Sequence, residues 1–456
     1  MTDVQKTETP AEQSAGVAEV AMPPGLATEP MGVRGYFHNY LLRVRGGDMG
    51  SLPAVGGLIV LVVFFLIVES GFGSLNNFAN MFREGTGTIF IAMGLVFVLL
   101  LGEIDLAAGY TAGICASVMA RMMDGYGWNW YLTIPTAIVT GLVIGLLIGV
   151  IVAKVRIPSF VVTLSFFLAF QGVCLLILNN GPGQHGQITL SDNVVNGFAS
   201  SYMPIWAGWL LVIIVVVGYA AQKLLAQAQR RREGLAGEPV AVLVAKIVTL
   251  AVVGSLVVYL LSQNRATGHP IRTVKYVNHV PQYVLVQPPK LQGVPYVIPV
   301  LLVLFVLLTF VLTRTRYGRH VYAVGGNTEA ARRAGINVDR VRISVFVIGA
   351  ALAAVGGIMI SSYTSSVSAN AFGGNTLLLA VGAAVIGGTS LFGGRGRVVD
   401  AIIGGAVVEV IYNGFSDLFQ GNNNAAIQLI AVGLALALAA TVDALSRRRA
   451  GASGLA

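Results

Sequence analysis

The feature that most constrains this chain is a succession of apolar runs, each about as long as a membrane-spanning helix must be. A helix needs about 20 mainly apolar residues to cross about 30 Å of hydrocarbon. The runs lie at 52–69, 86–102, 106–122, 130–152, 158–178, 204–221, 239–261, 296–313, 342–361, 376–389, 398–416 and 425–444. Because isolated strands cannot satisfy their backbone in lipid, the pattern predicts an all-α, polytopic bundle of about 12 transmembrane helices.

Composition excludes a soluble globular protein. Of the 456 residues, 55% are hydrophobic and 11% charged, and the mean hydropathy is +0.77. Soluble domains carry about 25% charged residues, which keep their surfaces from associating. The net charge of +9 does not indicate nucleic acid, because the cations lie in short clusters between the apolar runs and not in one patch with interleaved aromatic residues.

The positions of these clusters predict the orientation. Lysine and arginine are retained in cytoplasmic loops, and the less basic stretches Asn179–Met203 and Ser262–Tyr296 are then external. An even number of spans brings both termini to the cytoplasm. Residues 1–35, rich in Ala, Glu, Pro and Thr and without an apolar signal region, are expected to be a disordered cytoplasmic tail. The transmembrane domain is predicted at 36–446, with an added helix pair at about 204–295, and a second cytoplasmic tail at 447–456.

The stretch Tyr317–Asn337 has the signals of a short helix between two spans. Asn327 or Thr328 can cap its start, Glu329 favours the first turn, and Gly335 supplies a left-handed stop. A helix of two turns is not stable alone in water. It is either a capped connector or a knob on the cytoplasmic surface that a soluble motor subunit grips.

Two acids, Glu103 and Asp105, follow the second apolar run near its predicted cytoplasmic end. An acid at the centre of a bilayer costs about 2.5–3.5 kcal/mol on insertion scales, so its placement needs a reason. Asp105 can cap a helix that begins at Leu106. Alternatively, both acids belong to a gate or translocation path. The two interpretations stay open, and for Asp105 they are compatible.

Three segments together carry a family resemblance. They are YAVGGNTEAARRAGINVDR from Tyr322, GEIDLAAG at Gly102–Gly109, and VIGGTSLFGGRG at Val385–Gly396, the last followed by Asn413-Gly414. In this order they resemble the motifs of bacterial ABC sugar importer permeases of the ribose, galactose and xylose type. The extra residues at about 222–295 make the chain most similar to the longer, xylose-type members.

The resemblance implies a permease subunit that moves a monosaccharide, xylose or a related pentose, across the bacterial inner membrane. It implies a homodimer whose copies each contact an ABC ATPase subunit, with an extracytoplasmic sugar-binding protein docking outside. The residues implied to couple to the ATPase are Gly326, Asn327, Glu329, Ala330, Ala331, Arg332, Arg333, Gly335 and Ile336. The chain has no phosphate-binding loop of the Gly-x-x-x-x-Gly-Lys-Ser/Thr type. ATP and Mg are therefore expected on the partner, with no cofactor and no catalysis on this chain.

The chemistry of the cargo suggests pathway residues. A sugar is neutral and polyhydroxylated, so small polar groups and amides can contact it in transit. The candidates are Glu103, Asp105, Gln171, Asn375 and Asn413. Neither cysteine has a spacing that indicates a metal site.

Other functions remain alternatives at this stage. A secondary, ion-coupled sugar transporter would use Glu103 and Asp105 as a proton site, with Glu409 as the main further protonatable group inside a span. An ABC permease for branched-chain amino acids or nucleosides would share the architecture. A membrane-embedded enzyme is disfavoured because no nucleophile and base stand at a recognisable spacing.

Overall fold

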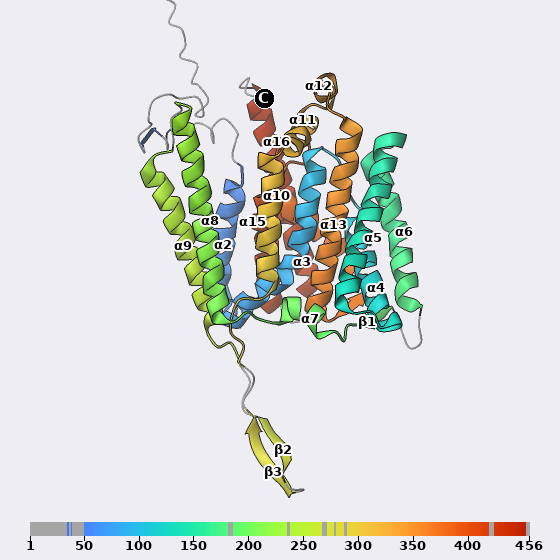
Figure 1. Cartoon of the computed structure of the whole chain (residues 1–456), viewed down its shortest axis with the longest axis vertical. Helices are drawn as coiled ribbons and strands as arrows, with labels where there is room; N and C mark the ends of the chain where they lie inside the picture. Colours follow the sequence, from blue (N-terminus) through green and yellow to red (C-terminus); the bar gives the residue numbers. More distant parts are fainter. Residues whose placement is uncertain are drawn as a thin grey trace, which may run out of the picture. The chain divides into compact units, whose positions relative to one another are not determined.

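The computed structural model describes residues 34–35, 38, 50–180, 186–234, 238–266, 271–277, 280–286, 290–418 and 424–452 (Figure 1). The chain divides into two compact units, and each is described by itself. The smaller contains Met1–Leu42 and Ile214–Ala251, and the larger contains Arg43–Ile213 and Val252–Ala456. The predicted N-terminal tail lies outside the described residues except at its last two positions.

The described chain is built almost entirely from helices. Ten long helices belong to the larger unit: α2 (Leu52–Val68), α3 (Leu75–Leu100), α4 (Ala108–Tyr126), α5 (Trp130–Val150), α6 (Ser159–Asn179), α10 (Val297–Arg314), α13 (Val338–Thr364), α14 (Gly374–Ile386), α15 (Val398–Leu418) and α16 (Asn424–Ala452). Its shorter elements are the π-turn Ile151–Val155, α7 (Asn193–Ser200), α11 (Arg316–Gly326), α12 (Thr328–Arg333) and the 3₁₀ turn Ala369–Phe372. Helices α8 (Ile205–Arg232) and α9 (Val240–Ser262) each run through both units.

Every apolar run predicted from the sequence is helical, which confirms a polytopic helical bundle. Within the described residues, nine helices are long and apolar enough to cross a membrane. Some boundaries were predicted wrongly. Helix α3 begins at Leu75 and not at 86, because polar residues of its first turns hide the helix from a hydropathy window. Helix α16 runs to Ala452, so the predicted tail from 447 begins as helix.

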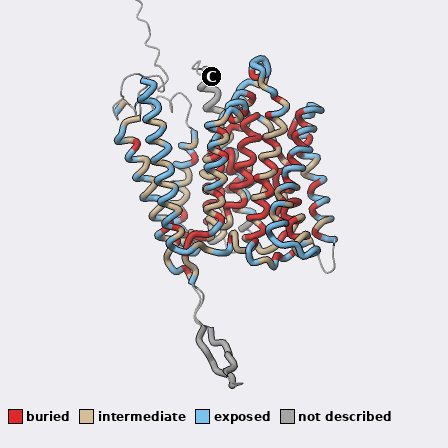
Figure 2. Tube along the Cα trace, viewed as in Figure 1, coloured by how far each residue is buried: buried red, intermediate tan, exposed pale blue. Residues whose placement is uncertain are grey.

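Helix α3 lies at the centre of the larger unit, packed against α13, α14 and α15. Its most apolar window is 83% buried within the protein, and Figure 2 shows the buried residues gathered in this interior. Small residues permit the close approach. A Cβ atom on Gly94 would lie 2.7 Å from the carbonyl oxygen of Gly349 on α13. Such contacts replace the hydrophobic drive that lipid does not supply between helices.

Helices α5 and α13 meet along a row of three glycines, Gly141, Gly145 and Gly149. Residues four apart lie on one helix face. A Cβ atom on any of the three would come within 2.5–2.9 Å of backbone atoms of α13. The backbone of α5 therefore rests directly on α13, and the absence of side chains at these positions is what lets the two helices touch.

The predicted all-α class omits two small sheets. Strand β1 (Gln187–Thr189) pairs antiparallel with β4 (Ser366–Ser368), and β2 (Ile271–Val277) pairs antiparallel with β3 (Val280–Val286). The β2–β3 segment is rich in Val, Ile, Thr and Tyr, which favour extended backbone. Both sheets come from stretches between apolar runs, where backbone groups outside the helices must find partners.

The smaller unit contains the end of α8 and the start of α9. The Glu238 carboxylate lies 2.8 Å from the Lys246 ammonium and 3.8 Å from that of Lys223. Arg230, Arg231 and Arg232 form the last turn of α8, where cations favour the helix dipole. Helix α8 thus continues through these arginines, beyond the apolar run predicted at 204–221.

Candidate functional site

The three sequence motifs, far apart in the chain, come together at the end of the larger unit that carries α12 (Figure 1). The backbone N–H of Gly394 donates to the carbonyl of Leu100 at the end of α3, at 2.8 Å. A Cβ atom on Gly325 of α11 would lie 1.8 Å from that same Leu100 oxygen. A Cβ atom on Gly102 would lie 3.3 Å from the Phe392 oxygen. Glycine is therefore required where these three segments cross.

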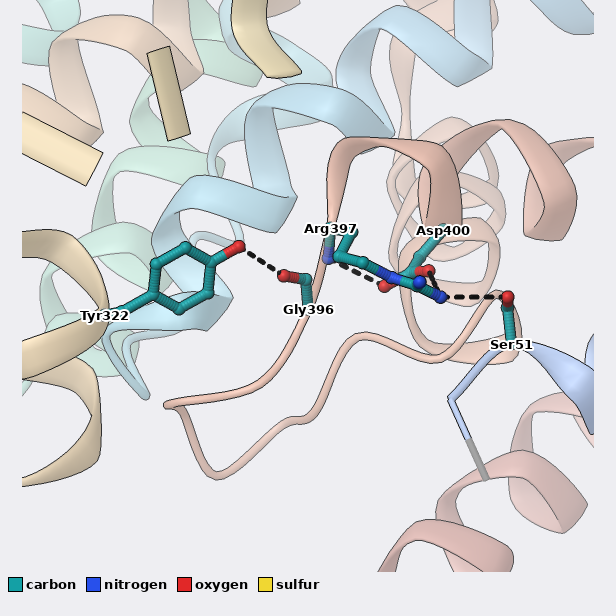
Figure 3. Close-up of polar contacts among 5 residues, drawn as sticks. All are labelled: Ser51, Tyr322, Gly396, Arg397 and Asp400. Atoms are coloured by element: carbon teal, nitrogen blue, oxygen red, sulfur yellow. Dashed lines mark hydrogen bonds and ion pairs between the residues drawn. The ribbon is translucent and has the colours of Figure 1, made fainter. Parts of the chain in front are cut away.

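Polar contacts fasten the motifs to one another (Figure 3). The hydroxyl of Tyr322 on α11 donates to the carbonyl of Gly396 at 2.7 Å. The next residue, Arg397, donates through Nη2 to the Ser51 hydroxyl at 3.0 Å, just before α2. Burial and the nearby Asp400 carboxylate raise the pKa of Tyr322, so its hydroxyl remains a donor.

The start of α15 has its own anchor in this cluster. The Asp400 carboxylate is 2% exposed and accepts from the backbone N–H of Arg397 at 2.7 Å and from its Nη2 at 3.3 Å. An acid three residues into a helix that reaches back to the N-terminal amide is one half of a capping box. The contact fixes the direction in which the loop Gly387–Arg397 enters α15.

Helix α12 stands at the surface of this convergence. The Asn327 side chain accepts from the Ala330 N–H at 2.9 Å, which confirms the predicted cap. Gly335 has φ +82°, which confirms the predicted left-handed stop. Glu329 pairs with Arg332 at 2.9 Å, but the two side chains are 60% and 53% exposed. A pair so open to solvent contributes about 0–1 kcal/mol.

The nine residues implied to couple to an ATPase divide by burial. Ala331 is buried and Ile336 is half-buried against the core, so these two hold α12 down. The exposed ones are Gly326, Asn327, Glu329, Ala330, Arg332, Arg333 and Gly335. Helix α12 therefore exposes a polar, mainly cationic surface, and its two ends are fixed by the N-terminal cap and the left-handed stop.

Beside α12 lies a charged pocket of about 260 Å³. Its lining residues are Glu103, Val152, Arg156, Ile157, Pro158, Arg332, Asp339 and Arg342. Glu103 forms an ion pair with Arg342 at 2.9 Å, and Asp339 forms one with Lys154 at 3.1 Å. Glu103, predicted as a pathway residue or a cap, thus lies beside the connection from α12 to α13.

Asp105 is 4% exposed and has no cationic partner among the described residues. Its Oδ1 accepts from the Ala107 N–H at 2.9 Å. Burial raises the pKa of Asp105 to about 6. Helix α4 begins at Ala108 and not at Leu106, so Asp105 satisfies an amide just before the helix and does not occupy the N-cap position itself.

The amide candidates lie elsewhere. Gln171 on α6 interacts with the Tyr110 side chain. The start of α14, which holds the exposed Asn375, approaches the same region: a Cβ on Gly373 would lie 3.3 Å from the Tyr110 hydroxyl. Asn413 lies on α15, and its Oδ1 is buried without a hydrogen-bond partner. In the part of the chain that is described, no three His, Cys, Asp or Glu side chains gather to hold a metal ion.

Sequence reasoning missed helix α11 and the contacts that it makes. The sequence predicted a helix only from Asn327 or Thr328 onward, yet Arg316–Gly326 is also helical. A signal was present, because Tyr317, Val321 and Val324 follow the spacing of one helix face. Tyr322, Arg397 and Arg342 were not singled out, and their partners lie too far away in the sequence for any local pattern to reveal.

Comparison with known proteins decides the family. Residues 77–440 match the family described as "Branched-chain amino acid transport system / permease component". The chain belongs to this family. It is 31% identical over 398 residues to the xylose transport system permease protein XylH of Escherichia coli, covering 87% of this chain and 92% of that protein.

Other relatives agree. The xylose transport system permease protein XylH of Haemophilus influenzae is 30% identical over 362 residues, covering 79% of this chain and 88% of that protein. The ribose import permease protein RbsC of Escherichia coli is 26% identical over 386 residues, covering 85% and 91%. No solved structure matches the chain. The resemblance to xylose- and ribose-type permeases is thereby confirmed, and the chain is a multi-pass membrane protein.

Proposed function

We propose that this chain is the membrane-spanning subunit of an ATP-driven ABC importer that carries xylose or a related pentose. The observation that carries the proposal is α12, a short exposed helix capped by Asn327 and stopped at Gly335, seated where the three motifs cross. Similarity to the xylose permeases supports the cargo. ATP and Mg would bind the partner ATPase, and this subunit would catalyse no reaction.

The exposed residues of α12 would contact the ATPase. A helix of six residues has little stability of its own. Here Ala331 and the caps hold its shape, while the charged side chains stay exposed. Movement of the ATPase would be transmitted through α11 and the Gly387–Arg397 loop. Tyr322 joins these two segments to each other, and Gly325 and Gly394 join them to Leu100 at the end of α3.

The translocation path would be lined by small polar groups. Gln171 and the start of α14 at Asn375 share the neighbourhood of Tyr110, where amides and an aromatic hydroxyl can meet sugar hydroxyls in turn. Asp105, buried at the break between α3 and α4, would lie near the cytoplasmic end of the path. Glu103, paired with Arg342 beside α12, would link that break to the coupling surface.

The assembly would be a homodimer in the bacterial inner membrane. Each copy would have about twelve spans and both termini in the cytoplasm. The arginine clusters support this orientation, because they would be retained inside. A sugar-binding protein would dock outside on Asn179–Met203 and Ser262–Tyr296. The permease domain would cover about 36–446, the limits expected from the sequence.

The test is Glu329→Gln in proteoliposomes that contain the ATPase and the binding protein. The internal pair with Arg332 is exposed, so its loss should leave thermal stability unchanged. Uptake of D-xylose and sugar-stimulated ATP hydrolysis should both fall at least about tenfold if the carboxylate meets a cation on the ATPase. Glu233→Gln, at another exposed acid, is the matched control and should have no effect. Wild-type rates for Glu329→Gln would remove this residue from the coupling surface.

The family description favours one alternative cargo, a branched-chain amino acid. The same proteoliposomes distinguish the two. Saturable, ATP-dependent uptake of leucine with none of D-xylose or D-ribose would replace the sugar proposal while leaving the coupling assignment intact.

A further inference from the structure

Helix α15 carries two buried oxygen atoms without a hydrogen-bond partner, Oε1 of Glu409 and Oδ1 of Asn413. The Glu409 side chain belongs to a residue only 9% exposed. Since the two residues are four apart, they lie on the same face of the helix. Buried polar atoms in folded proteins nearly always have a partner, so two unpartnered acceptors on one helix face require an explanation.

The surroundings of Glu409 are polar, and the side chains of Tyr363 and Tyr412 both interact electrostatically with it. Its side chain lies against α3, where a Cβ on Gly85 would be 2.9 Å from Oε2. The adjacent Glu84 is a second carboxylate that interacts electrostatically with Glu409. Glu84 already accepts a hydrogen bond from the Tyr363 hydroxyl, at 3.2 Å. The Tyr363 hydroxyl is therefore engaged with Glu84, and Oε1 of Glu409 has no hydrogen-bond partner among the described residues.

The residue types indicate the class of ligand. Both oxygens can accept a hydrogen bond, so a ligand that donates to each of them would satisfy both. The hydroxyls of a neutral sugar can supply such donors. A metal ion is a weaker fit, because no three carboxylate, histidine or cysteine side chains gather among the described residues.

We propose that Glu409 and Asn413 form a hydroxyl-binding subsite for the sugar inside the bundle, with Glu84 and Tyr363 on the facing helices. The proposal rests on the proposed function, since it assigns residues to that cargo's path. Gly85 lets α3 close over Glu409 in the structure. Access for a sugar would require α3 and α15 to separate at this point.

The experiment compares Glu409→Leu and Asn413→Leu with wild type in proteoliposomes with the ATPase and the binding protein. D-xylose and D-ribose are the probes, and the readout is sugar taken up per ATP hydrolysed. Each variant should lower this ratio about tenfold or more, as expected for the loss of a hydrogen bond to the ligand. ATP hydrolysis stimulated by the loaded binding protein should stay near wild type, because α12 is unchanged.

Stability separates a ligand site from a structural one. Because both oxygens lack partners in the structure, apolar replacements should leave the melting temperature equal or higher. Glu409→Gln and Asn413→Ser, which keep an acceptor, should retain most of the sugar-to-ATP ratio. Ser117→Ala is the control: this buried hydroxyl already donates to the Gly113 carbonyl at 2.7 Å, so its loss should not change the ratio.

Three results would overturn the proposal. The first is an unchanged sugar-to-ATP ratio in both leucine variants. The second is wild-type uptake that requires a proton or sodium gradient, with Glu409→Gln abolishing this requirement, because the ligand would then be a cation. The third is the absence of any ATP-driven pentose uptake by wild type, which would overturn the proposed function and the subsite together.

Discussion

The Glu103 carboxylate lies 2.9 Å from the Arg342 guanidinium, and this ion pair joins the break between α3 and α4 to the first turns of α13. The two side chains are 13% and 25% exposed. Since α12 lies just before α13 in the chain, the pair connects the short exposed helix to the centre of the bundle. Its strength can be measured directly.

Arg342→Gln should destabilise the protein by about 1–3 kcal/mol, because it leaves Glu103 largely buried without its partner. The matched control is Lys154→Gln, which breaks a pair whose side chains are 61% and 33% exposed and should cost at most about 1 kcal/mol. Thermal unfolding in detergent compares the two. Equal losses would mean that burial does not strengthen the Glu103–Arg342 pair.

Gly325→Ala should be strongly disruptive, whereas Gly326→Ala should not. A Cβ at Gly325 would lie 1.8 Å from the Leu100 oxygen, and a Cβ at Gly326 meets nothing within 4 Å. Displacing α11 from the end of α3 should cost about 1–3 kcal/mol. Melting temperature and membrane yield report the difference. Similar values for the two variants would show that the segments do not cross as closely as described.

Tyr322→Phe removes the hydroxyl that donates to Gly396 and retains the aromatic ring. We expect a loss of about 0.5–1.5 kcal/mol in unfolding free energy. The structure also predicts faster hydrogen exchange at backbone amides of the Gly387–Arg397 loop, because α11 no longer holds it. Mass spectrometry of the exchanging protein tests this, and wild-type protection in that loop would contradict the prediction.

Asp105→Asn should stabilise the protein at pH 7.5 and make no difference below about pH 4. The pKa of Asp105 is raised from 3.8 to about 6, so the folded state holds its proton more tightly than the unfolded state. Stability is therefore greatest below the unfolded value, falls as pH rises between about 4 and 6, and stays lower above. The shift corresponds to at most about 3 kcal/mol.

Asparagine keeps an oxygen that can accept from the Ala107 N–H, so the turn before α4 should survive the substitution. Melting temperatures of wild type and variant across pH 4–8 provide the measurement. Curves that run parallel throughout this range would show that Asp105 does not change its proton affinity on folding.

The sequence predicted the features that depend on residues close together in the chain, namely the long helices and the ends of α12. The length of the apolar runs was sufficient for the helices. Asn327 and Gly335 were sufficient for the ends of α12, because a cap and a left-handed stop act within one turn. The β1–β4 pair escaped prediction because its two strands come from separate loops, 187–189 and 366–368.

The sequence predicted the three motifs of the candidate site, but it did not predict that they lie together in the fold. Nothing local to Gly102, Gly325 or Gly394 states that they cross, because their contacts join residues hundreds of positions apart. The same holds for Glu103, because nothing near it in the sequence indicates that Arg342 is its partner. Asp105 was expected to cap at Leu106, but the chain makes a further turn before α4 begins at Ala108.

The glycine row of α5 has a consequence for the synthesis of the protein. Gly141, Gly145 and Gly149 rest on the backbone of α13, yet α13 begins only at Val338. At about 5–20 residues per second, the ribosome needs on the order of 10–40 s to make the intervening chain. During that delay the glycine row of α5 faces lipid or another helix. Helix α5 therefore lacks its final packing partner until α13 has been made.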